Sequence, residues 1–232
     1  FFRVNPTGRA PGGALGVSPF IMNATESLVN IAFNSSLKAY GGNPAVGAMT
    51  ICSSVLQVFF LLLQGIAQGA QPIIGFNYGA RQLDRVKKAF KLLIISAFTF
   101  SCAACLALEL FPQAFVMLFN DKPELVDLAV WALRIYGCGM VMRGGQTSCQ
   151  QTFVALGQAK ISLFLALLRK IILLLPLILI LPRVLVGHQV MAVFLAEPVA
   201  DVLAALTTGC MFLWRFPRIL ERRRQELEKK HA

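Results

Sequence analysis

One stretch of the sequence decides its class: Gly65-Ile66-Ala67-Gln68-Gly69-Ala70-Gln71-Pro72-Ile73-Ile74-Gly75-Phe76-Asn77-Tyr78-Gly79-Ala80-Arg81. It ends a long apolar segment with glycines, amide side chains and a proline, at a depth where a membrane helix would still lie in lipid. Polar and helix-breaking residues are tolerated there only where they line a cavity or pack against other helices. The stretch therefore predicts a membrane protein with a solute pathway rather than a soluble core.

The composition of the whole chain supports the same class. Of 232 residues, 56% are hydrophobic and 14% are charged, whereas soluble domains carry roughly a quarter charged residues. Lys and Arg number 22 against 11 Asp and Glu, and the basic residues lie mostly between or beyond the apolar segments. A membrane topology explains this charge better than a nucleic-acid partner does, so we expect no nucleic acid to bind.

The apolar segments number six, each near the roughly 20 residues that a spanning helix needs. We place them at residues 17–39, 45–71, 89–111, 125–154, 161–181 and 188–214. The predicted fold is an all-α integral membrane protein, a bundle of six transmembrane helices. The fourth segment is long enough to reach roughly 45 Å as a straight helix. Its glycines predict a bend, or alternatively a split into two shorter helices: Gly137, Gly139, Gly144 and Gly145.

The charges of the connections predict the orientation. The link after residue 80 and the tail after residue 214 are basic, which places both on the cytoplasmic side. The loop at 112–127 is mainly acidic and the turn at 40–44 is uncharged, so both face outward. The basic residues of 81–91 alternate with apolar ones, which favours a helix lying on the anionic membrane surface. Residues 215–232 are predicted to be a basic cytoplasmic tail.

Residues 1–16 are rich in Gly and Pro, which predicts a cytoplasmic linker before a six-helix unit at 17–214. With six crossings, both ends of this chain are expected in the cytoplasm. The sequence begins with Phe1 and shows neither an initiator Met nor a secretion signal. We therefore expect the chain to be a fragment of a longer protein.

No motif of an enzyme occurs in the sequence. Zinc motifs, phosphate-binding loops and nucleophile elbows are all missing. The six cysteines fall inside apolar segments, which favours small buried hydrophobic residues over a redox or metal pair at Cys102 and Cys105. We predict a protein that is not an enzyme and that needs no cofactor or resident metal.

The first apolar segment carries one polar stripe. Asn23, Glu26, Asn30 and Asn34 are spaced three, four and four residues apart, which places all four on one face of a helix. A charged side chain at the bilayer centre costs about 2.5 to 3.5 kcal/mol, so Glu26 must face the bundle interior, a partner or water. Glu26 then either binds a coupling ion or substrate together with Asn30 and Asn34, or it is a protonated acid hydrogen-bonded between helices.

The second apolar segment repeats the pattern with amides: Gln57, Gln64, Gln68 and Gln71. Amide stripes suit a wet cavity, and they also hold helices together by hydrogen bonds. Gln64 and Gln68 are thus candidates for either role. Gly65 and Gly69 form a pair of small residues that predicts close packing of another helix.

The last apolar segment holds two acids, Glu197 and Asp201, one turn apart. Two carboxylates this close repel each other unless a cation lies between them. We expect Arg169, Arg134 or Arg143 to pair with them in a structural role, and a site for the transported ion is the alternative. Lys170 lies about 100° round the helix from Arg169, so we expect it to face elsewhere or to extend to the membrane surface.

Several short runs together resemble the multidrug and toxic compound extrusion (MATE) family, in its bacterial multidrug-exporter branch. The resemblance covers roughly residues 15–215, and its motifs follow the order of the carboxy-terminal lobe, helices seven to twelve of a twelve-helix transporter. They are Gly16-Val17-Ser18-Pro19-Phe20, Tyr40-Gly41-Gly42-Asn43-Pro44-Ala45-Val46, Gln68 to Ala80, Leu167-Leu168-Arg169-Lys170, Leu175-Pro176 and Glu197-Pro198-Val199-Ala200-Asp201.

The resemblance implies an antiporter in the bacterial cell membrane. It would export cationic drugs or toxic organic compounds while a proton or sodium ion enters. The missing amino-terminal lobe would be a partner, beside membrane lipids and small organic cations, and this half alone would be inactive. Some members bind the coupling ion at an acid in the seventh helix, and Glu26 stands at about that place. An acidic partner in the tenth helix is absent between Leu128 and Phe153, which argues against a two-carboxylate sodium site.

The walls of the substrate cavity are expected to be apolar and aromatic, with Met22, Phe33, Phe59 and Phe60 as candidates. Two other functions stay open. A lipid-linked oligosaccharide or lipid flippase of the same superfamily would need a basic cavity, and the interior acids count against it. A membrane scaffold without transport would need no aligned polar stripe.

Overall fold

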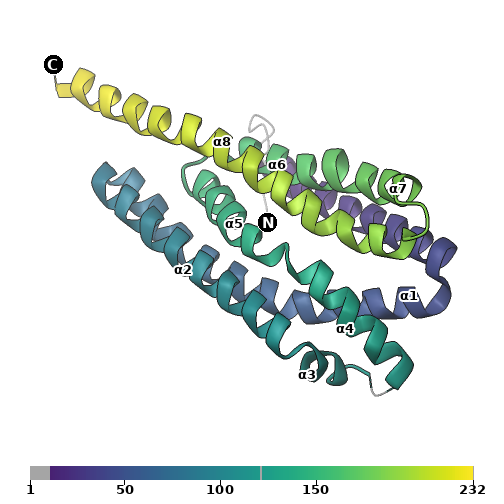
Figure 1. The fold of residues 1–232 in the computed structure, drawn as a ribbon. Helices are drawn as coiled ribbons and strands as arrows, with labels where there is room; N and C mark the ends of the chain where they lie inside the picture. Colours follow the sequence, from purple (N-terminus) through teal and green to yellow (C-terminus); the bar gives the residue numbers. More distant parts are fainter. Residues whose placement is uncertain (1–10, 121, 232) are drawn as a thin grey trace, which may run out of the picture.

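The structure is a computed structural model that describes residues 11–120 and 122–231, and helices account for the regular structure of these residues. In chain order the helices are α1 (Pro11–Gly79), α2 (Leu83–Leu110), α3 (Pro112–Met117), α4 (Pro123–Gly137), α5 (Met140–Ala155), α6 (Ala159–Leu167), the π-helix η1 (Leu168–Leu174), α7 (Leu175–Val184) and α8 (Gln189–His231). They form an elongated bundle (Figure 1). The predicted all-α fold is confirmed.

Helix α1 consists of two arms. Its apolar part, Ala24–Gly79, has 56 residues and would reach roughly 84 Å if straight, far more than the ~30 Å of bilayer hydrocarbon. The chain reverses instead at Gly42, whose φ of 66° and ψ of −162° are not helical and are readily adopted by glycine. Figure 1 shows the turn at the end of the purple arm. The predicted turn at 40–44 therefore separates two predicted spans.

Three more helices have the length and apolarity of membrane spans: Leu83–Leu110, Ala159–Val184 and Gln189–Gln225. A further span is broken, because Leu125–Gly137 and Met140–Ala155 meet at 45°. The predicted bend in the fourth segment is thus confirmed, near Gly137 and Gly139. With the two arms of α1 counted separately, the described residues contain the six predicted crossings.

The fifth crossing changes its helix type halfway. The Leu175 N–H donates to the Lys170 carbonyl, five residues earlier, which is the hydrogen bond of a π-helix. Pro176 follows at the start of α7, where its lack of an N–H prevents the ordinary α-helical bond. The π segment spans Leu168–Leu174 and therefore contains both Arg169 and Lys170.

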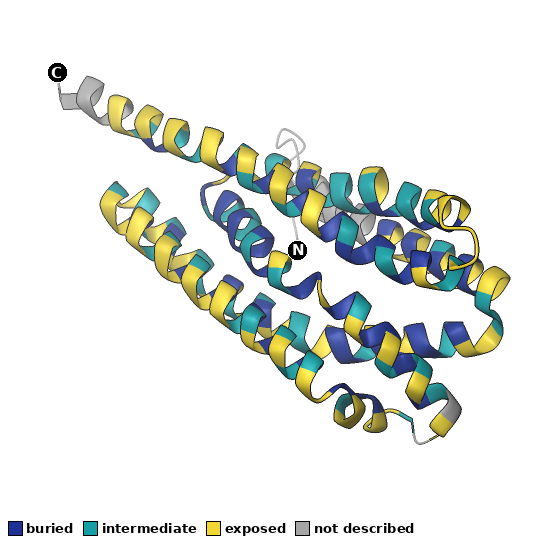
Figure 2. Ribbon diagram, viewed as in Figure 1, coloured by how far each residue is buried: buried dark blue, intermediate teal, exposed yellow. Residues whose placement is uncertain are grey.

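The core runs along the centre of the bundle. It includes Leu37 and Val55 from the two arms of α1, Leu133 from α4, Ile178 from α7 and Phe194 from α8. Figure 2 shows buried residues along facing helices and exposed ones along the outer faces. Many large apolar side chains on the outside are exposed, for instance Leu61, Leu92, Ile172 and Leu213, as expected for a surface in contact with lipid.

The ends of two helices differ from the predictions. Residues 83–91 are not a separate surface helix, because α2 continues without a break to Leu110 and buries Val86. Continuation keeps the backbone hydrogen bonds that a bend would break. The predicted tail extends α8 as helix to His231. Of the predicted linker, residues 1–10 lie outside the described residues and 11–16 belong to α1, so the boundaries of the three predicted units stay a prediction.

Candidate functional site

A cavity of about 470 Å³ lies between both arms of α1, α4, α5, η1 and α8. Polar and aromatic side chains share its wall with a few aliphatic ones. The lining residues are Glu26, Val29, Asn30, Phe33, Ser53, Leu56, Gln57, Phe60, Tyr136, Arg143, Arg169, Lys170, Leu174 and Glu197. The two ionic groups described next form part of this wall.

The first group, the inner charge cluster, consists of Arg143 from α5, Arg169 from η1, and Glu197 and Asp201 from α8. Arg169 donates from Nε to Asp201 Oδ1 at 2.7 Å and from Nη2 to Glu197 Oε1 at 2.5 Å. Arg143 donates from Nε to Asp201 Oδ2 at 3.0 Å and from Nη2 to Glu197 Oε1. The four charges sum to zero, and only 5% of Glu197 and 1% of Asp201 is exposed.

The geometry of the inner charge cluster follows from the helices that carry it. Glu197 and Asp201 are four residues apart on α8 and so share one face. Gly139 allows the bent span to approach them, because a Cβ at this position would lie 2.6 Å from Asp201 Oδ2. The predicted pairing with Arg169 is confirmed, and Arg143 joins it. Arg134 does not, since its side chain lies on an exposed position of α4.

The second group is the Glu26–Lys170 pair. The Lys170 ammonium donates to Glu26 Oε2, and the side chain of Glu26 is 56% exposed against 19% for Lys170. The expectation that Glu26 has a partner, water or the bundle interior beside it is confirmed. The expectation that Lys170 faces elsewhere is wrong, because Arg169 and Lys170 both line the cavity. Both lie in the π-helix, whose longer turn reduces the angle between adjacent residues.

The remaining polar candidates of α1 separate into two sets. Asn30 and Gln57 line the cavity. Gln64 accepts a hydrogen bond from Gln151 Nε2 at 3.3 Å, which is the interhelical role. Asn34 and Gln68 are exposed and are not among the lining residues, and the side chain of Asn23 lies outside the described residues.

The expected packing at Gly65 and Gly69 is wrong for the described part of this chain. A Cβ at either glycine would meet no described atom within 4 Å. The face of α1 that carries the two glycines is open, so no helix of the described bundle packs against them.

Aromatic rings complete the cavity wall. Phe33 and Tyr136 meet edge to face at 6.3 Å between ring centroids, and the Arg143 guanidinium carbon lies 5.6 Å from the centroid of Phe60. Phe33 and Phe60 thus line the cavity as expected. Phe59 instead packs on Phe115 at 5.4 Å, and the side chain of Met22 lies outside the described residues.

Sequence reasoning missed Tyr136 and Ser53 as lining residues. Neither stands in a polar stripe, so no periodic signal marked them. Among residues 11–120 and 122–231, no group of three or more His, Cys, Asp or Glu is placed to hold a metal ion. Cys102 and Cys105 are free thiols.

Comparison with known proteins identifies relatives of this arrangement. The family model described as MatE matches residues 19–180. The multidrug export protein MepA of Staphylococcus haemolyticus strain JCSC1435 is 23% identical over 190 residues, which cover 82% of this chain and 42% of MepA. MepA of Staphylococcus aureus strain MSSA476 is 22% identical over 192 residues, with 83% and 42% covered. The chain therefore spans less than half the length of the curated relatives it matches.

Solved transporter structures also match this fold. A multidrug resistance MATE family transporter of the MOP superfamily in its outward-facing conformation superposes with a TM-score of 0.79 at 20% identity, over 88% of this chain and 45% of that one. The MATE multidrug transporter DinF-BH, solved as a complex with a ligand, is 33% identical with a TM-score of 0.73 and the same coverage. A MOP superfamily transporter from Pyrococcus furiosus, described as having a binding pocket of reverse polarity, scores 0.78 at 21% identity.

Proposed function

We propose, because this chain belongs to the MATE family of multidrug efflux transporters, that it forms one lobe of an exchanger in which an organic cation leaves the cell as a proton or sodium ion enters. The chain covers 45% of the matched transporter structures, which supports a second lobe as partner. From the order of its motifs, we infer that this is the carboxy-terminal lobe. We further propose the bacterial cell membrane as its location, with both ends of the chain in the cytoplasm.

The observation that carries the proposal is the Glu26–Lys170 pair in the cavity wall. A carboxylate in a cavity with aromatic walls favours a neutralising partner, because part of its hydration is lost there. Lys170 provides one neutralising charge. A proton on Glu26, or an organic cation beside it, can replace Lys170 in that role.

Competition for one carboxylate links the two transported species. A proton and a monovalent organic cation each add one positive charge to the cavity, and each needs the same oxygen atoms of Glu26. Their binding is therefore mutually exclusive, and a lobe that changes conformation in only one charge state exchanges them. Phe33, Phe60 and Tyr136 line the same cavity and offer faces and edges to the aromatic part of a substrate.

The inner charge cluster is proposed to stay out of the exchange. Each of its carboxylates already accepts hydrogen bonds from both arginines, so no lone charge is left for an incoming ion. The same pairing argues against the flippase alternative, since the cavity cations Arg143, Arg169 and Lys170 all have acidic partners. A scaffold would have no use for a polar cavity of this kind.

The test is dye export by cells that express the complete transporter containing this lobe. Glu26→Gln keeps the shape of the protonated acid but cannot titrate, so we expect export of ethidium to be lost while expression is kept. Asn30→Ala should reduce export less. Asn34→Ala is the matched control, because Asn34 belongs to the same stripe and is exposed outside the cavity. Export at the unmodified rate by a well-expressed Glu26→Gln variant would disprove the proposed role.

Vesicles distinguish the coupling ions and test the need for a second lobe. In vesicles of the complete transporter, dye uptake should follow an imposed proton or sodium gradient and stop when that gradient is removed. The 232-residue chain alone should give no uptake, because alternating access needs one bundle to move against another. Uptake by the chain alone, with cross-linking showing a monomer, would contradict the two-lobe proposal.

A further inference from the structure

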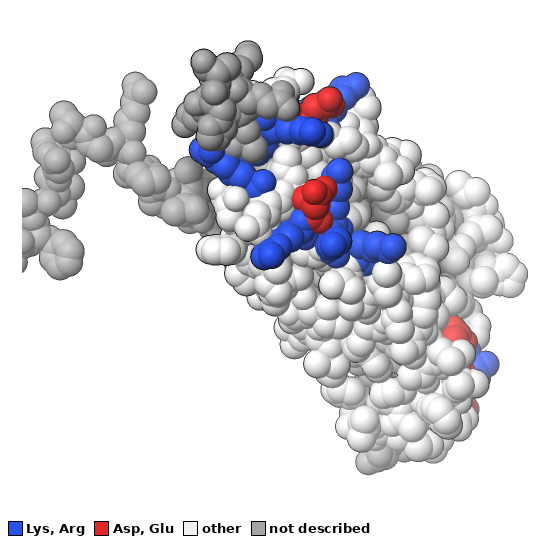
Figure 3. All heavy atoms as spheres, turned by 90° about the vertical axis from the view of Figure 1, so that its left-hand side faces the viewer, with Lys and Arg blue, Asp and Glu red and all other residues white. Residues whose placement is uncertain are grey.

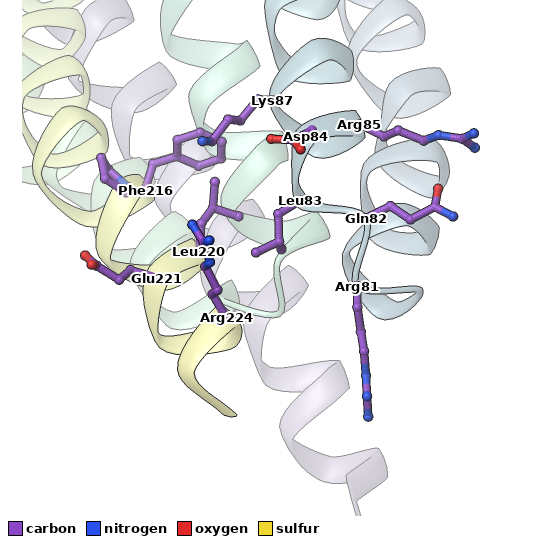
Figure 4. A pocket seen from close by; sticks show the side chains of 11 residues that line it. Arg81, Gln82, Leu83, Asp84, Arg85, Lys87, Phe216, Leu220, Glu221 and Arg224 are labelled. Atoms are coloured by element: carbon purple, nitrogen blue, oxygen red, sulfur yellow. The ribbon is translucent and has the colours of Figure 1, made fainter. Parts of the chain in front are cut away.

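A second and larger pocket lies at the basic end of the molecule. Its volume is about 970 Å³, and it lies between the start of α2 and the extension of α8 (Figure 4). It is lined by Arg81, Gln82, Leu83, Asp84, Arg85 and Lys87 on one side and by Phe216, Pro217, Leu220, Glu221 and Arg224 on the other. The proposed exchange uses none of these residues.

The pocket has an apolar floor and a charged rim. Leu83, Phe216 and Leu220 lie between the two helices in Figure 4, and Leu220 is 4% exposed within a cluster that includes Val86. Lys87 extends from α2 toward Phe216, and the Arg224 guanidinium lies beside Leu220 (Figure 4). The lining contains four basic and two acidic residues. Arg81 and Arg85 point away from α8, whereas Lys87 and Arg224 extend into the space between the helices (Figure 4), so these two cations favour an anion there. The floor favours an anion that carries an apolar part.

The aromatic residues around the pocket place it at the membrane surface. Trp214 lies on α8 just before Phe216, and the guanidinium carbons of Arg215 and Arg218 are 5.0 and 4.1 Å from its ring centroid. Tyr78, near the end of α1, has the Arg223 guanidinium carbon 5.5 Å from its ring centroid. Trp and Tyr with neighbouring basic residues are typical of the level of lipid headgroups.

The distribution of charge agrees with this level. Figure 3 shows Lys, Arg and a few acids gathered at one end of the face that carries the α1–α2 connection and α8, above a broad uncharged region. The uncharged region is the part expected in hydrocarbon. The pocket thus lies where the phosphates of one leaflet meet the protein.

The backbone of Arg81 sets the geometry of the connection between α1 and α2. This residue has a positive φ of 65°, in a turn closed by bonds from the Arg81 N–H to the Tyr78 carbonyl at 3.2 Å and from the Gln82 N–H to the Asn77 carbonyl at 2.9 Å. Glycine or asparagine adopts this conformation with less strain. These two bonds form a Schellman motif at the end of α1, and the turn fixes where α2 begins at the edge of the pocket.

We propose that this pocket binds the phosphate of an anionic phospholipid, with Lys87 and Arg224 contacting the headgroup and Leu83, Phe216 and Leu220 contacting the glycerol and upper acyl chain. By the distribution of basic residues, the lipid comes from the cytoplasmic leaflet. A lipid bound there would join the beginning of α2 to α8 across the open end of the bundle.

The experiment is native mass spectrometry of the complete transporter containing this lobe, in detergent, titrated with phosphatidylglycerol and, separately, with phosphatidylcholine. We expect one phosphatidylglycerol to bind in clear preference to phosphatidylcholine. The double variant Lys87→Gln, Arg224→Gln should weaken phosphatidylglycerol binding on the order of tenfold or more, since each basic residue near an anionic surface contributes roughly fivefold. Equal binding of the two lipids would overturn the proposal.

The matched control removes two neighbouring charges outside the pocket. Lys88→Gln, Arg222→Gln changes the net charge by the same amount, and neither residue lines the pocket, so phosphatidylglycerol binding should stay within about twofold. An equal loss in both double variants would reduce the effect to general surface charge and overturn the site. Displacement of phosphatidylglycerol by millimolar inorganic phosphate would show a site for a soluble anion instead.

A conservative variant protects the test against misfolding. Lys87→Arg, Arg224→Lys keeps both charges and should bind phosphatidylglycerol within about threefold of the unmodified transporter. If the neutral double variant loses its helical circular dichroism, this conservative variant and the two single neutral variants decide the question. If the conservative variant folds but no longer binds phosphatidylglycerol, recognition of the lipid by positive charge is contradicted.

Discussion

Two neighbouring cations on one π-helix have opposite surroundings. Arg169 is held by Glu197 and Asp201 in the buried inner charge cluster, whereas Lys170 meets only Glu26 among the ion pairs of the described residues, in a cavity where the Glu26 side chain is 56% exposed. The inner charge cluster contains two arginines and two carboxylates and connects three helices, α5, η1 and α8. The Glu26–Lys170 pair contains one cation and one carboxylate, and it is open to the cavity. The difference fits the proposal that the first group holds the fold and the second exchanges its partner.

The largest expected effect is loss of the inner charge cluster. Arg169→Gln leaves the cluster with one excess negative charge in a buried place, and breaking such a pair typically costs about 3 to 5 kcal/mol. We expect a correspondingly large fall in thermal stability, measured by unfolding in detergent. Lys170→Gln, one residue further along the same π-helix, is the control and should cost less than about 1 kcal/mol.

The double variant Arg169→Gln, Asp201→Asn sharpens this test, because it leaves one Arg and one Glu in the cluster. The stability that it loses should be smaller than the sum of the losses in the two single variants, and the difference, the coupling energy, should be about 0.5 to 3 kcal/mol. Additive and small effects, together with lost transport, would mean that Glu197 and Asp201 bind the transported ion. The functional site would then move from Glu26 to α8.

A smaller effect is expected when the approach of the bent span to α8 is obstructed. In Gly139→Ala the new Cβ would lie 2.6 Å from Asp201 Oδ2 and 3.1 Å from the Pro198 Cα. One of these groups must move, and overpacking of this kind costs about 1 to 3 kcal/mol. Gly145→Ala is the control, because a Cβ there meets nothing within 4 Å. Equal melting temperatures for both variants would show that the cluster tolerates a shift of α5.

Glu26→Gln should change stability by less than about 1 kcal/mol, since half-exposed ion pairs contribute little. The same variant is expected to abolish export, so its stability and its activity should separate. A fall in stability as large as that of Arg169→Gln would place Glu26 among the structural charges and erase the contrast between the two groups.

The smallest effect concerns the amide pair between α1 and α5. The hydrogen bond from Gln151 to Gln64 is 3.3 Å long, and interhelical bonds in membranes average about 0.6 kcal/mol. The cycle Gln64→Ala, Gln151→Ala and the double variant should give a coupling near that value. A coupling above about 2 kcal/mol would indicate that this contact stabilises the bundle more strongly than such bonds usually do.

The crossings were predictable because each rests on local signals. A run of apolar residues predicts a span, the run Tyr40 to Pro44 predicts the reversal at Gly42, and the glycines near Gly139 predict the bend. The stripe of Glu26 and Asn30 was predictable for the same reason, since helical period alone places both on one face. The structure adds which helix that face meets.

What the sequence could not predict depends on tertiary context. The π segment Leu168–Leu174 has no distinctive composition, so the direction of Lys170 was missed. The break after Gly137 resets the helical phase between Arg134 and Arg143, so period could not tell which of them meets Asp201. Gly65 and Gly69 predict close packing, but whether a helix is present to fill the space is a property of the assembled protein.

The π-helix also gives the fifth crossing one residue of slack in length. In an ordinary packed helix, deletion of one residue rotates every later side chain by about 100° and moves Ile178 and its neighbours out of the core. Here we expect a deletion within 168–174 to convert the wide turn into an α turn, so that α7 keeps its register. The change is expected instead at Arg169 and Lys170, of which only one would keep its acidic partner. Chains that differ in length by one residue at this point should therefore share the fold and differ in which of the two ion pairs they keep.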